Sequence, residues 1–258
     1  MQRVKDKVVV LTGAASGIGR ATAILFSKEG ATLVLSDIDE KGLNETYEMI
    51  AEKDKTEIMK VDVRKSEEVK KMIDFTIEQY RRIDVLIPNA GVVRVGPVED
   101  FPDEDYDLLI DVNLKGLFYT CKHAIPHFKK QKYGSIITLA SVAAHIGQEF
   151  HANYCSTKHG VLGFTKGLAL DMAPFNVRVN SVSPGATDTP MLRGDVAQQA
   201  KDRGLDFEIV KKEFESQGVL TRWARSEEIA TGILFLATEE SSYMTGSDLR
   251  IDGGWTTR

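Results

Sequence analysis

Near the start of the chain, residues 8–19 read VVVLTGAASGIG. The four apolar residues that open this stretch are typical of a strand covered on both faces of its sheet. Gly13, Gly17 and Gly19 then let the main chain turn sharply and approach a ligand closely, because glycine has no Cβ atom. A glycine-rich turn that leads from a strand into a helix presents free N–H groups and the positive end of the helix dipole. Such a turn favours a pyrophosphate.

Further apolar runs along the chain extend this pattern. Strands are expected at residues 33–36, 58–61, 85–87, 136–139, 177–182 and 249–251. Helices are expected between them, at residues 19–29, 40–52, 67–80, 105–131, 152–172 and 226–238. Because strand and helix alternate, we expect an α/β Rossmann fold, a doubly wound parallel sheet of about seven strands flanked by helices. No linker or repeat divides the sequence, so residues 1–258 are interpreted as a single dinucleotide-binding and catalytic domain.

Residues 187–218 break the alternation of strand and helix. This segment is polar and charged, and Gly194 and Gly204 are candidate hinges. An irregular stretch of this length in a compact domain is typical of a functional lid, here with a short helix expected at residues 206–215. The alternative is an inert surface excursion.

Composition excludes several classes of function. A net charge of -5 and a pI near 5.6 give no electrostatic basis for binding nucleic acid or an anionic membrane surface. The chain has no apolar run long enough for a membrane span and no signal-peptide core, so we expect a cytoplasmic protein. Its two cysteines, Cys121 and Cys155, form no metal-binding motif. His123 and His127 have HxxxH spacing, but Pro126 lies between them and no third ligand is evident, so no metal is expected.

Asp37 ends the second expected strand, 18 positions after Gly19. A carboxylate there can accept hydrogen bonds from the diol of an adenosine ribose, whereas a 2′-phosphate would meet a like charge. The neighbours considered, Ile38 and Ser16, offer no basic clamp. If this repulsion costs ~2 kcal/mol of binding free energy, a cofactor without the 2′-phosphate would bind roughly thirtyfold more tightly, so we expect NAD rather than NADP. The alternative role of Asp37 is to cap the next helix.

Two more polar segments follow expected strands. Asp62 and Val63 come after the third strand, and Asn89-Ala90-Gly91 come after the fourth. Both lie at carboxyl ends of strands that flank the expected topological switch point, where ligands bind in such sheets. Ordinary turn chemistry is the alternative for either segment.

Tyr154 and Lys158 are four residues apart in the run YCSTK, which puts a phenol and an ammonium group on one helix face. At ~4 Å and an effective dielectric of about 20, their attraction would be about 4 kcal/mol. This could lower the tyrosine pKa by up to about three units and make it an acid/base catalyst near neutral pH. A surface Tyr-Lys pair is the alternative. Ser141, after the apolar run at residues 135–140, favours the catalytic interpretation.

Taken together, these segments resemble the short-chain dehydrogenase/reductase family over essentially the full length of the chain. The resemblance rests on residues 12–19, 89–91 and 251–254, Asn113, Ser141, Tyr154 with Lys158, and Pro184-Gly185 with Thr189. It implies a catalytic tetrad of Asn113, Ser141, Tyr154 and Lys158. The cofactor contacts that it implies are Gly13, Ser16, Gly17, Ile18, Gly19, Asp37, Asp62, Val63, Asn89, Ala90, Gly91, Tyr154, Lys158, Pro184, Gly185, Thr187 and Thr189. It also implies oligomers, commonly homotetramers.

One position departs from the family. Pro88 stands where the family often has a second Asn. Proline lacks an N–H group, so a local hydrogen bond should differ, but Asn89 remains and we expect activity to be retained.

The expected reaction converts a secondary alcohol into a carbonyl compound with NAD. Tyr154 is then the general base for oxidation and the general acid for reduction. Ser141 would hold the substrate oxygen, Lys158 would serve both the phenol and the nicotinamide ribose, and Asn113 would hold a water that leads from Lys158 to solvent. A structural role for Asn113, satisfied by neighbouring backbone, is the alternative.

Substrate choice is expected to come from residues 92–95, 143–151 and the lid. The candidate substrate contacts are Arg94, His145, Gln148, His151 and Met191. These side chains suit a hydroxyl-rich substrate, which favours a sugar, polyol or cyclic alcohol, although each could instead face water. A 3-oxoacyl-[acyl-carrier-protein] reductase is the alternative, for which Lys129, Lys130 and Lys132 supply a basic cluster. A dinucleotide-binding sensor or scaffold without turnover is the alternative from another class.

Overall fold

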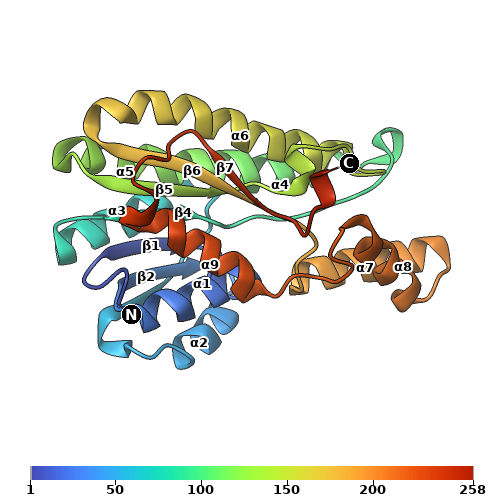
Figure 1. The fold of residues 1–258 in the computed structure, drawn as a ribbon, viewed down its shortest axis with the longest axis horizontal. Helices are drawn as coiled ribbons and strands as arrows, with labels where there is room; N and C mark the ends of the chain where they lie inside the picture. The colour runs from blue at the N-terminus through green and yellow to red at the C-terminus, as the bar shows by residue number, and fades with distance from the viewer. Residues whose placement is uncertain (1, 258) are drawn as a thin grey trace.

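The computed structural model describes residues 2–257, which form three layers with a parallel sheet in the middle (Figure 1). The strands lie in the order β3-β2-β1-β4-β5-β6-β7. Their bounds are β1 (Val8–Thr12), β2 (Thr32–Asp37), β3 (Thr56–Lys60), β4 (Val85–Pro88), β5 (Gly134–Leu139), β6 (Val177–Pro184) and β7 (Asp248–Ile251). Strand β1 pairs with β2 on one side and β4 on the other, so the switch point lies between β1 and β4. The expected doubly wound sheet is confirmed.

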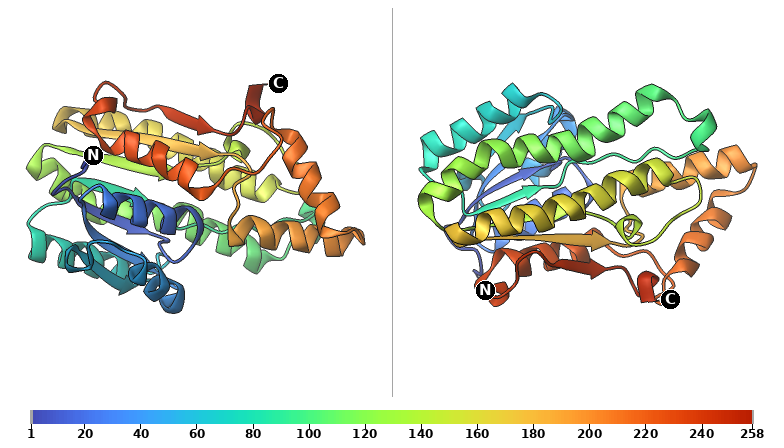
Figure 2. Two further views of the ribbon diagram at one scale, coloured as in Figure 1. Left: turned by 60° about the horizontal axis from the view of Figure 1, so that its bottom comes forward. Right: turned by 90° about the horizontal axis from the view of Figure 1, so that it is seen from above.

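Helices cover both faces of the sheet. On one face lie α1 (Gly17–Lys28), α2 (Glu40–Glu48) and α9 (Ser226–Ala237). On the other lie α3 (Ser66–Tyr80), α4 (Asp103–Ile110), α5 (Leu117–Gln131) and α6 (Ala152–Met172), of which α3, α5 and α6 run side by side (Figure 2, right). Each face has its own apolar core, because the central strands contribute side chains to both sides.

The prediction of one uninterrupted helix at residues 105–131 is wrong in detail. Helix α4 and helix α5 are separated by a π-helical turn at Asp111–Gly116. A π turn inserts an extra residue without ending the helix, so apolar periodicity does not reveal it. Asn113 lies in this turn, and turns of this kind are frequent at functional sites.

The expected lid contains two helices rather than one. Helix α7 (Pro190–Arg203) and helix α8 (Phe207–Gln217) extend beyond the carboxyl ends of the strands at one end of the molecule (Figure 1). Thr189 caps helix α7: its hydroxyl accepts the Leu192 N–H, and Pro190 follows at the first helical position. A β-bridge between Thr187 and Ala224 holds the chain before α7 next to the chain after α8. The two helices therefore project from the same place on the molecule.

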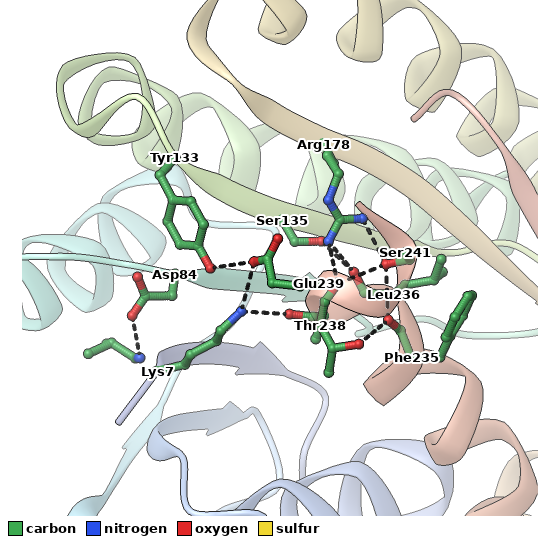
Figure 3. A network of polar contacts seen from close by, with 12 residues as sticks. Lys7, Asp84, Tyr133, Ser135, Arg178, Phe235, Leu236, Thr238, Glu239 and Ser241 are labelled. Atoms are coloured by element: carbon green, nitrogen blue, oxygen red, sulfur yellow. Dashed lines mark hydrogen bonds and ion pairs between the residues drawn. The ribbon is translucent and has the colours of Figure 1, made fainter. Parts of the chain in front are cut away.

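The amino ends of the strands, at the side of the sheet opposite the lid, carry a network of polar contacts (Figure 3). Arg178, at the start of β6, donates to the carbonyls of Leu236 and Thr238 at 2.9 and 3.0 Å. These carbonyls belong to the end of α9, where helical carbonyls lack helical partners. The Ser135 hydroxyl also donates to the Leu236 carbonyl. The network therefore fastens α9 to the amino ends of the central strands.

Candidate active site

A cavity opens at the carboxyl ends of the strands, over the switch point between β1 and β4. Its walls come from the glycine-rich turn, the ends of β4, β5 and β6, the first turns of α6, and the lid. The residues predicted as cofactor contacts that line it are Gly13, Ser16, Gly17, Ile18, Gly19, Asp37, Asn89, Ala90, Gly91, Tyr154, Lys158, Pro184, Gly185, Thr187 and Thr189. Residues far apart in the sequence thus form one continuous surface.

The glycine-rich turn has the conformation that its sequence suggests. Gly13 and Gly17 have φ of +70° and +51°, a region that favours glycine. A Cβ atom on Gly13 would lie 2.8 Å from the Cα of Ala90, so only glycine lets β1 and the segment after β4 approach this closely. The Asn89 amide group donates to the carbonyls of Thr12 and Gly13 and holds them together. The turn and the start of α1 therefore fit a pyrophosphate.

Asp37 lies beside this turn and has both of its oxygens positioned by backbone. Its Oδ2 accepts the Ala15 N–H at 2.9 Å, and its Oδ1 accepts the Asp39 N–H at 3.0 Å. Each oxygen retains a second lone pair for a ribose hydroxyl. Helix α2 is capped by Asp39 rather than by Asp37, so the capping alternative for Asp37 is wrong.

A basic residue near Asp37 escaped the sequence analysis. Lys60 stands opposite Asp37 in the register of β2 and β3, although it lies far away in the sequence. Its ammonium group pairs with Glu40 at 3.5 Å. Strand pairing brings Lys60 to this end of the sheet, which the spacing of sequence neighbours alone could not reveal.

Asp62 and Val63 do not line the cavity. Asp62 lies in a neighbouring depression with Ile38 and Lys60, where Arg64 Nη2 contacts its Oδ2 at 2.7 Å. The hydrogen bond from Arg64 lowers the pKa of Asp62 although burial opposes it. Val63 is buried against Gly116 in the π turn. Contact of either residue with the adenine end of a cofactor stays a prediction.

Ser141, Tyr154 and Lys158 meet at the cavity from two elements. Ser141 follows β5, and Tyr154 and Lys158 lie on α6. The Lys158 ammonium lies 5.7 Å from the centre of the Tyr154 ring and donates to the Leu139 carbonyl at 2.9 Å. The phenol and the cation therefore face the same space, as their spacing predicted.

Asn113 lies behind this group. Its Oδ1 accepts the Val92 N–H at 2.9 Å, and its Nδ2 donates to the Val92 carbonyl and to the Thr157 hydroxyl. The amide thereby fixes the segment after β4 against α6. This is the structural role left open by the sequence, and the role in holding a water stays a prediction.

Burial governs the pKa values of the two ionisable groups. It raises the pKa of Tyr154 to about 12, although a hydrogen bond with Ser141 opposes the rise. It lowers the pKa of Lys158 to about 8. The expected net fall of the Tyr154 pKa is therefore wrong in this structure, because withdrawal from water disfavours the phenolate more than its neighbours favour it.

Among the predicted substrate contacts, Gln148, His151 and Met191 line the cavity. His145 and Arg94 do not, and contact of either residue with a substrate stays a prediction. The ring of His145 contacts Asp248 at 2.9 Å and Ser183 at 3.2 Å, which directs it toward β6 and β7. Arg94 pairs with Asp105 on α4 at the surface.

The lid contributes an acidic residue that the sequence analysis missed. Asp195 lines the cavity together with Met191 and Leu192, which lie on the same side of α7. The Thr-Pro pair at 189–190 was the available signal, because it marks the start of a helix. A helix starting there places residues 191 and 195 on one face.

Two general properties complete the description of residues 2–257. Within that range, no helix has both the length and the apolarity to cross a membrane. In the same part of the chain, no group of three His, Cys, Asp or Glu side chains is arranged to hold a metal ion. His123 instead contacts the Ser66 hydroxyl through Nε2 at 2.9 Å.

Comparison with known proteins gives close matches over the whole chain. A family model described as enoyl-(acyl carrier protein) reductase matches residues 13–256. The 3-oxoacyl-[acyl-carrier-protein] reductase FabG of Thermotoga maritima is 39% identical over 98% of both chains. The cyclopentanol dehydrogenase of Comamonas testosteroni is 35% identical over 99% of both. The crystal structure of levodione reductase superposes with a TM-score of 0.93 at 30% identity, over 98% of each chain.

Proposed function

This chain belongs to the short-chain dehydrogenase/reductase family and is an oxidoreductase, and we propose that it interconverts a secondary alcohol and its carbonyl compound with NAD. The observation that carries the proposal is that Ser141, Tyr154 and Lys158 line the same cavity as the glycine-rich turn. We propose a sugar, polyol or cyclic alcohol as the substrate. The name of the cyclopentanol dehydrogenase supports a cyclic alcohol.

The proposed roles follow from the positions of the side chains. When bound, the nicotinamide dinucleotide accepts or supplies the hydride. Before oxidation, the Tyr154 hydroxyl loses its proton to solvent. The resulting phenolate then takes the proton of the substrate hydroxyl, and in reduction the phenol gives its proton to the substrate oxygen. Ser141 holds the substrate oxygen within reach of the phenol. The positive charge of Lys158 stabilises the phenolate whenever it forms.

The proposed preference for NAD rests on Asp37. Its carboxylate has free lone pairs for a ribose diol and would repel a 2′-phosphate. The cations in the neighbouring depression each have an acidic partner: Lys60 pairs with Glu40, Arg64 with Asp62 and Lys65 with Glu68. The charge at this end of the cavity therefore favours the cofactor without the extra phosphate.

Reduction of a 3-oxoacyl group on a carrier protein is the second candidate, favoured by the FabG relative. The basic cluster that suggested it lies at the end of α5, next to the start of β5, and Lys129 stacks on Phe175 just before β6. The basic cluster therefore lies at the amino ends of the strands, whereas the cavity opens at their carboxyl ends. The cluster is therefore poorly placed to guide a carrier protein to the cavity. A scaffold without turnover is disfavoured because Ser141, Tyr154 and Lys158 are all present and line one cavity.

A screen for turnover tests the proposed function. Secondary alcohols are offered with NAD or NADP, and their ketones and a 3-oxoacyl thioester are offered with NADH or NADPH, while the absorbance of the reduced nicotinamide is followed. We expect oxidation of sugars, polyols or cyclic alcohols with NAD. Turnover of the thioester alone with NADPH would favour the second candidate, and cofactor binding without any turnover would favour a scaffold.

A further inference from the structure

A buried pair of opposite charges lies in the wall of the cavity. His151, at the start of α6, and Asp195, on the lid helix α7, both line it. His151 Nε2 and Asp195 Oδ2 are 3.6 Å apart, and the two side chains are only 7% and 5% exposed. The pair thus joins the catalytic helix to the lid at the place where a substrate would lie.

The hydrogen bonds of His151 determine its protonation. Its Nδ1 lies 2.6 Å from the Glu149 carbonyl, which can only accept, so Nδ1 carries a proton. Its Nε2 faces a carboxylate, and a lone pair there would be repelled, so Nε2 carries a proton as well. Burial disfavours the charged ring, but contacts with Asp195 and the Glu149 carbonyl outweigh it, and the pKa of His151 lies above its ordinary value. The Tyr154 ring lies beside it, with the ring centres 6.4 Å apart and the ring planes at 69° to each other.

Asp195 keeps capacity to bind more donors. Its Oδ1 accepts from the Gln199 amide at 3.2 Å, and its Oδ2 faces His151. A carboxylate has about four acceptor positions, so about two remain for groups in the cavity. Asp195 also acts on the reacting end of the site, because its charge contributes to the raised pKa of Tyr154.

Among the described residues that line the cavity, Lys158 and His151 are the cationic side chains. Lys158 lies beside the Tyr154 ring and donates to the Leu139 carbonyl, and His151 is paired with Asp195 itself. Met191, Leu192 and Phe214 make the adjoining wall apolar. A carboxylate or phosphate placed next to Asp195 would thus meet a buried negative charge whose partner cation, His151, is already engaged with it, which is costly at low dielectric.

We propose that Asp195, held by His151, selects uncharged substrates that carry a second hydroxyl group close to the reacting carbon, and excludes anionic ones. This inference rests on the proposed function and narrows its substrate class. The second hydroxyl donates to the Asp195 carboxylate while the first lies between Ser141 and Tyr154. A hydrogen bond to a charged acceptor contributes about 1.5–3 kcal/mol, which corresponds to a preference of at least about tenfold.

Four ring compounds that differ in one substituent test the proposal. They are cyclohexanol, cis- and trans-1,2-cyclohexanediol, and 2-hydroxycyclohexanecarboxylate, each assayed for kcat/KM with NAD. We expect the wild-type protein to prefer one diol over cyclohexanol by about tenfold and to disfavour the carboxylate by at least about tenfold. In Asp195→Leu the preference for the diol should disappear. In Asp195→Asn, which preserves side-chain volume, discrimination against the carboxylate should fall about tenfold and the pH profile of oxidation should move to lower pH.

Asp202 supplies a matched control on the same helix. It is exposed and accepts from Gln198, as Asp195 accepts from Gln199. Asp202→Leu and Asp202→Asn should leave every substrate ratio unchanged. Turnover of all four compounds with ratios that Asp195→Asn does not alter would overturn this inference alone. Absence of turnover with every alcohol and either cofactor would overturn the proposed function and the inference with it.

Discussion

The charge state of Tyr154 sets the direction in which the proposed reaction responds to pH. Its hydroxyl is buried, and burial raises the pKa of Tyr154 to about 12. Lys158 is also buried, and burial lowers its pKa to about 8. The phenol is therefore neutral and the ammonium charged at neutral pH. Lys158 helps the phenolate to form only while the lysine keeps its proton.

This charge state predicts opposite pH profiles for the two directions. Oxidation needs the phenolate, so its kcat/KM should rise with pH, and the rise should flatten as Lys158 loses its proton above about pH 8. Reduction needs the protonated phenol, so its kcat/KM should fall over the same range. Steady-state rates in both directions from neutral to alkaline pH check this. Oxidation that does not change with pH would contradict it.

Asp37 and Glu40 control the charge at the adenosine end of the cavity. In Asp37→Asn the repulsion of a 2′-phosphate is lost, so the ratio of kcat/KM for NADP over NAD should rise by roughly thirtyfold, corresponding to ~2 kcal/mol. Adding Glu40→Gln frees Lys60 from its ion pair and should raise the ratio further. Kinetics with both cofactors measure the effect. A ratio that stays the same in the double variant would contradict the role given to Asp37.

At the scale of elements, the contacts of Arg178 explain how α9 is held (Figure 3). Its guanidinium satisfies the carbonyls of Leu236 and Thr238 and donates to Ser241 at 2.9 Å. Replacing it would leave buried carbonyls with fewer partners. The contact is remote from the cavity, so its loss should affect stability rather than chemistry.

Arg178→Leu should lower the free energy of unfolding by about 2–4 kcal/mol, because several charge-assisted hydrogen bonds are lost. The KM for NAD should stay the same. Arg225→Leu is a suitable control, since that side chain is 71% exposed and its loss should cost within about 0.5 kcal/mol. Denaturant unfolding followed by circular dichroism measures both. Equal stability of the two variants would refute the proposed fastening of α9.

The sequence predicted the regular elements better than the loops. Buried strands such as β1 and β5 were found because both faces are covered and their residues form short apolar runs. Helix α7 was missed because its apolar stripe is short, consisting of Leu192, Val196 and Ala200 among mostly polar residues. Thr189 and Pro190 mark its start. His145 and Arg94 do not line the cavity, because loop conformation decides where such side chains point. Lys60 and Asp195 were overlooked because strand pairing and lid folding bring them to the site.

At the scale of the whole molecule, the two ends of the strands differ in function. The carboxyl ends carry the glycine-rich turn, the proposed catalytic residues and the lid, whereas the amino ends carry the Arg178 network. Ligand sites at the carboxyl ends are the rule for doubly wound sheets. Substitutions at the amino ends should therefore change stability, and those at the carboxyl ends should change turnover.

A homotetramer in the cytoplasm remains the proposed state of the protein. Large apolar side chains are exposed on α4, α5 and α6, at Tyr106, Phe118 and Leu170. Apolar groups exposed along neighbouring helices are candidates for contact between subunits. Light scattering coupled to gel filtration should give a mass about four times 28.6 kDa. A mass of one chain at micromolar concentration would contradict the proposal.

The central claim is that Tyr154 exchanges a proton with the substrate beside a bound nicotinamide. Single-turnover oxidation of the best alcohol found in the screen, compared between wild type and Tyr154→Phe, tests it most directly. We predict that the rate falls by about 10²–10⁴-fold while NAD binding, followed by titration, is retained. A variant that transfers hydride at a near-normal rate would contradict the claim.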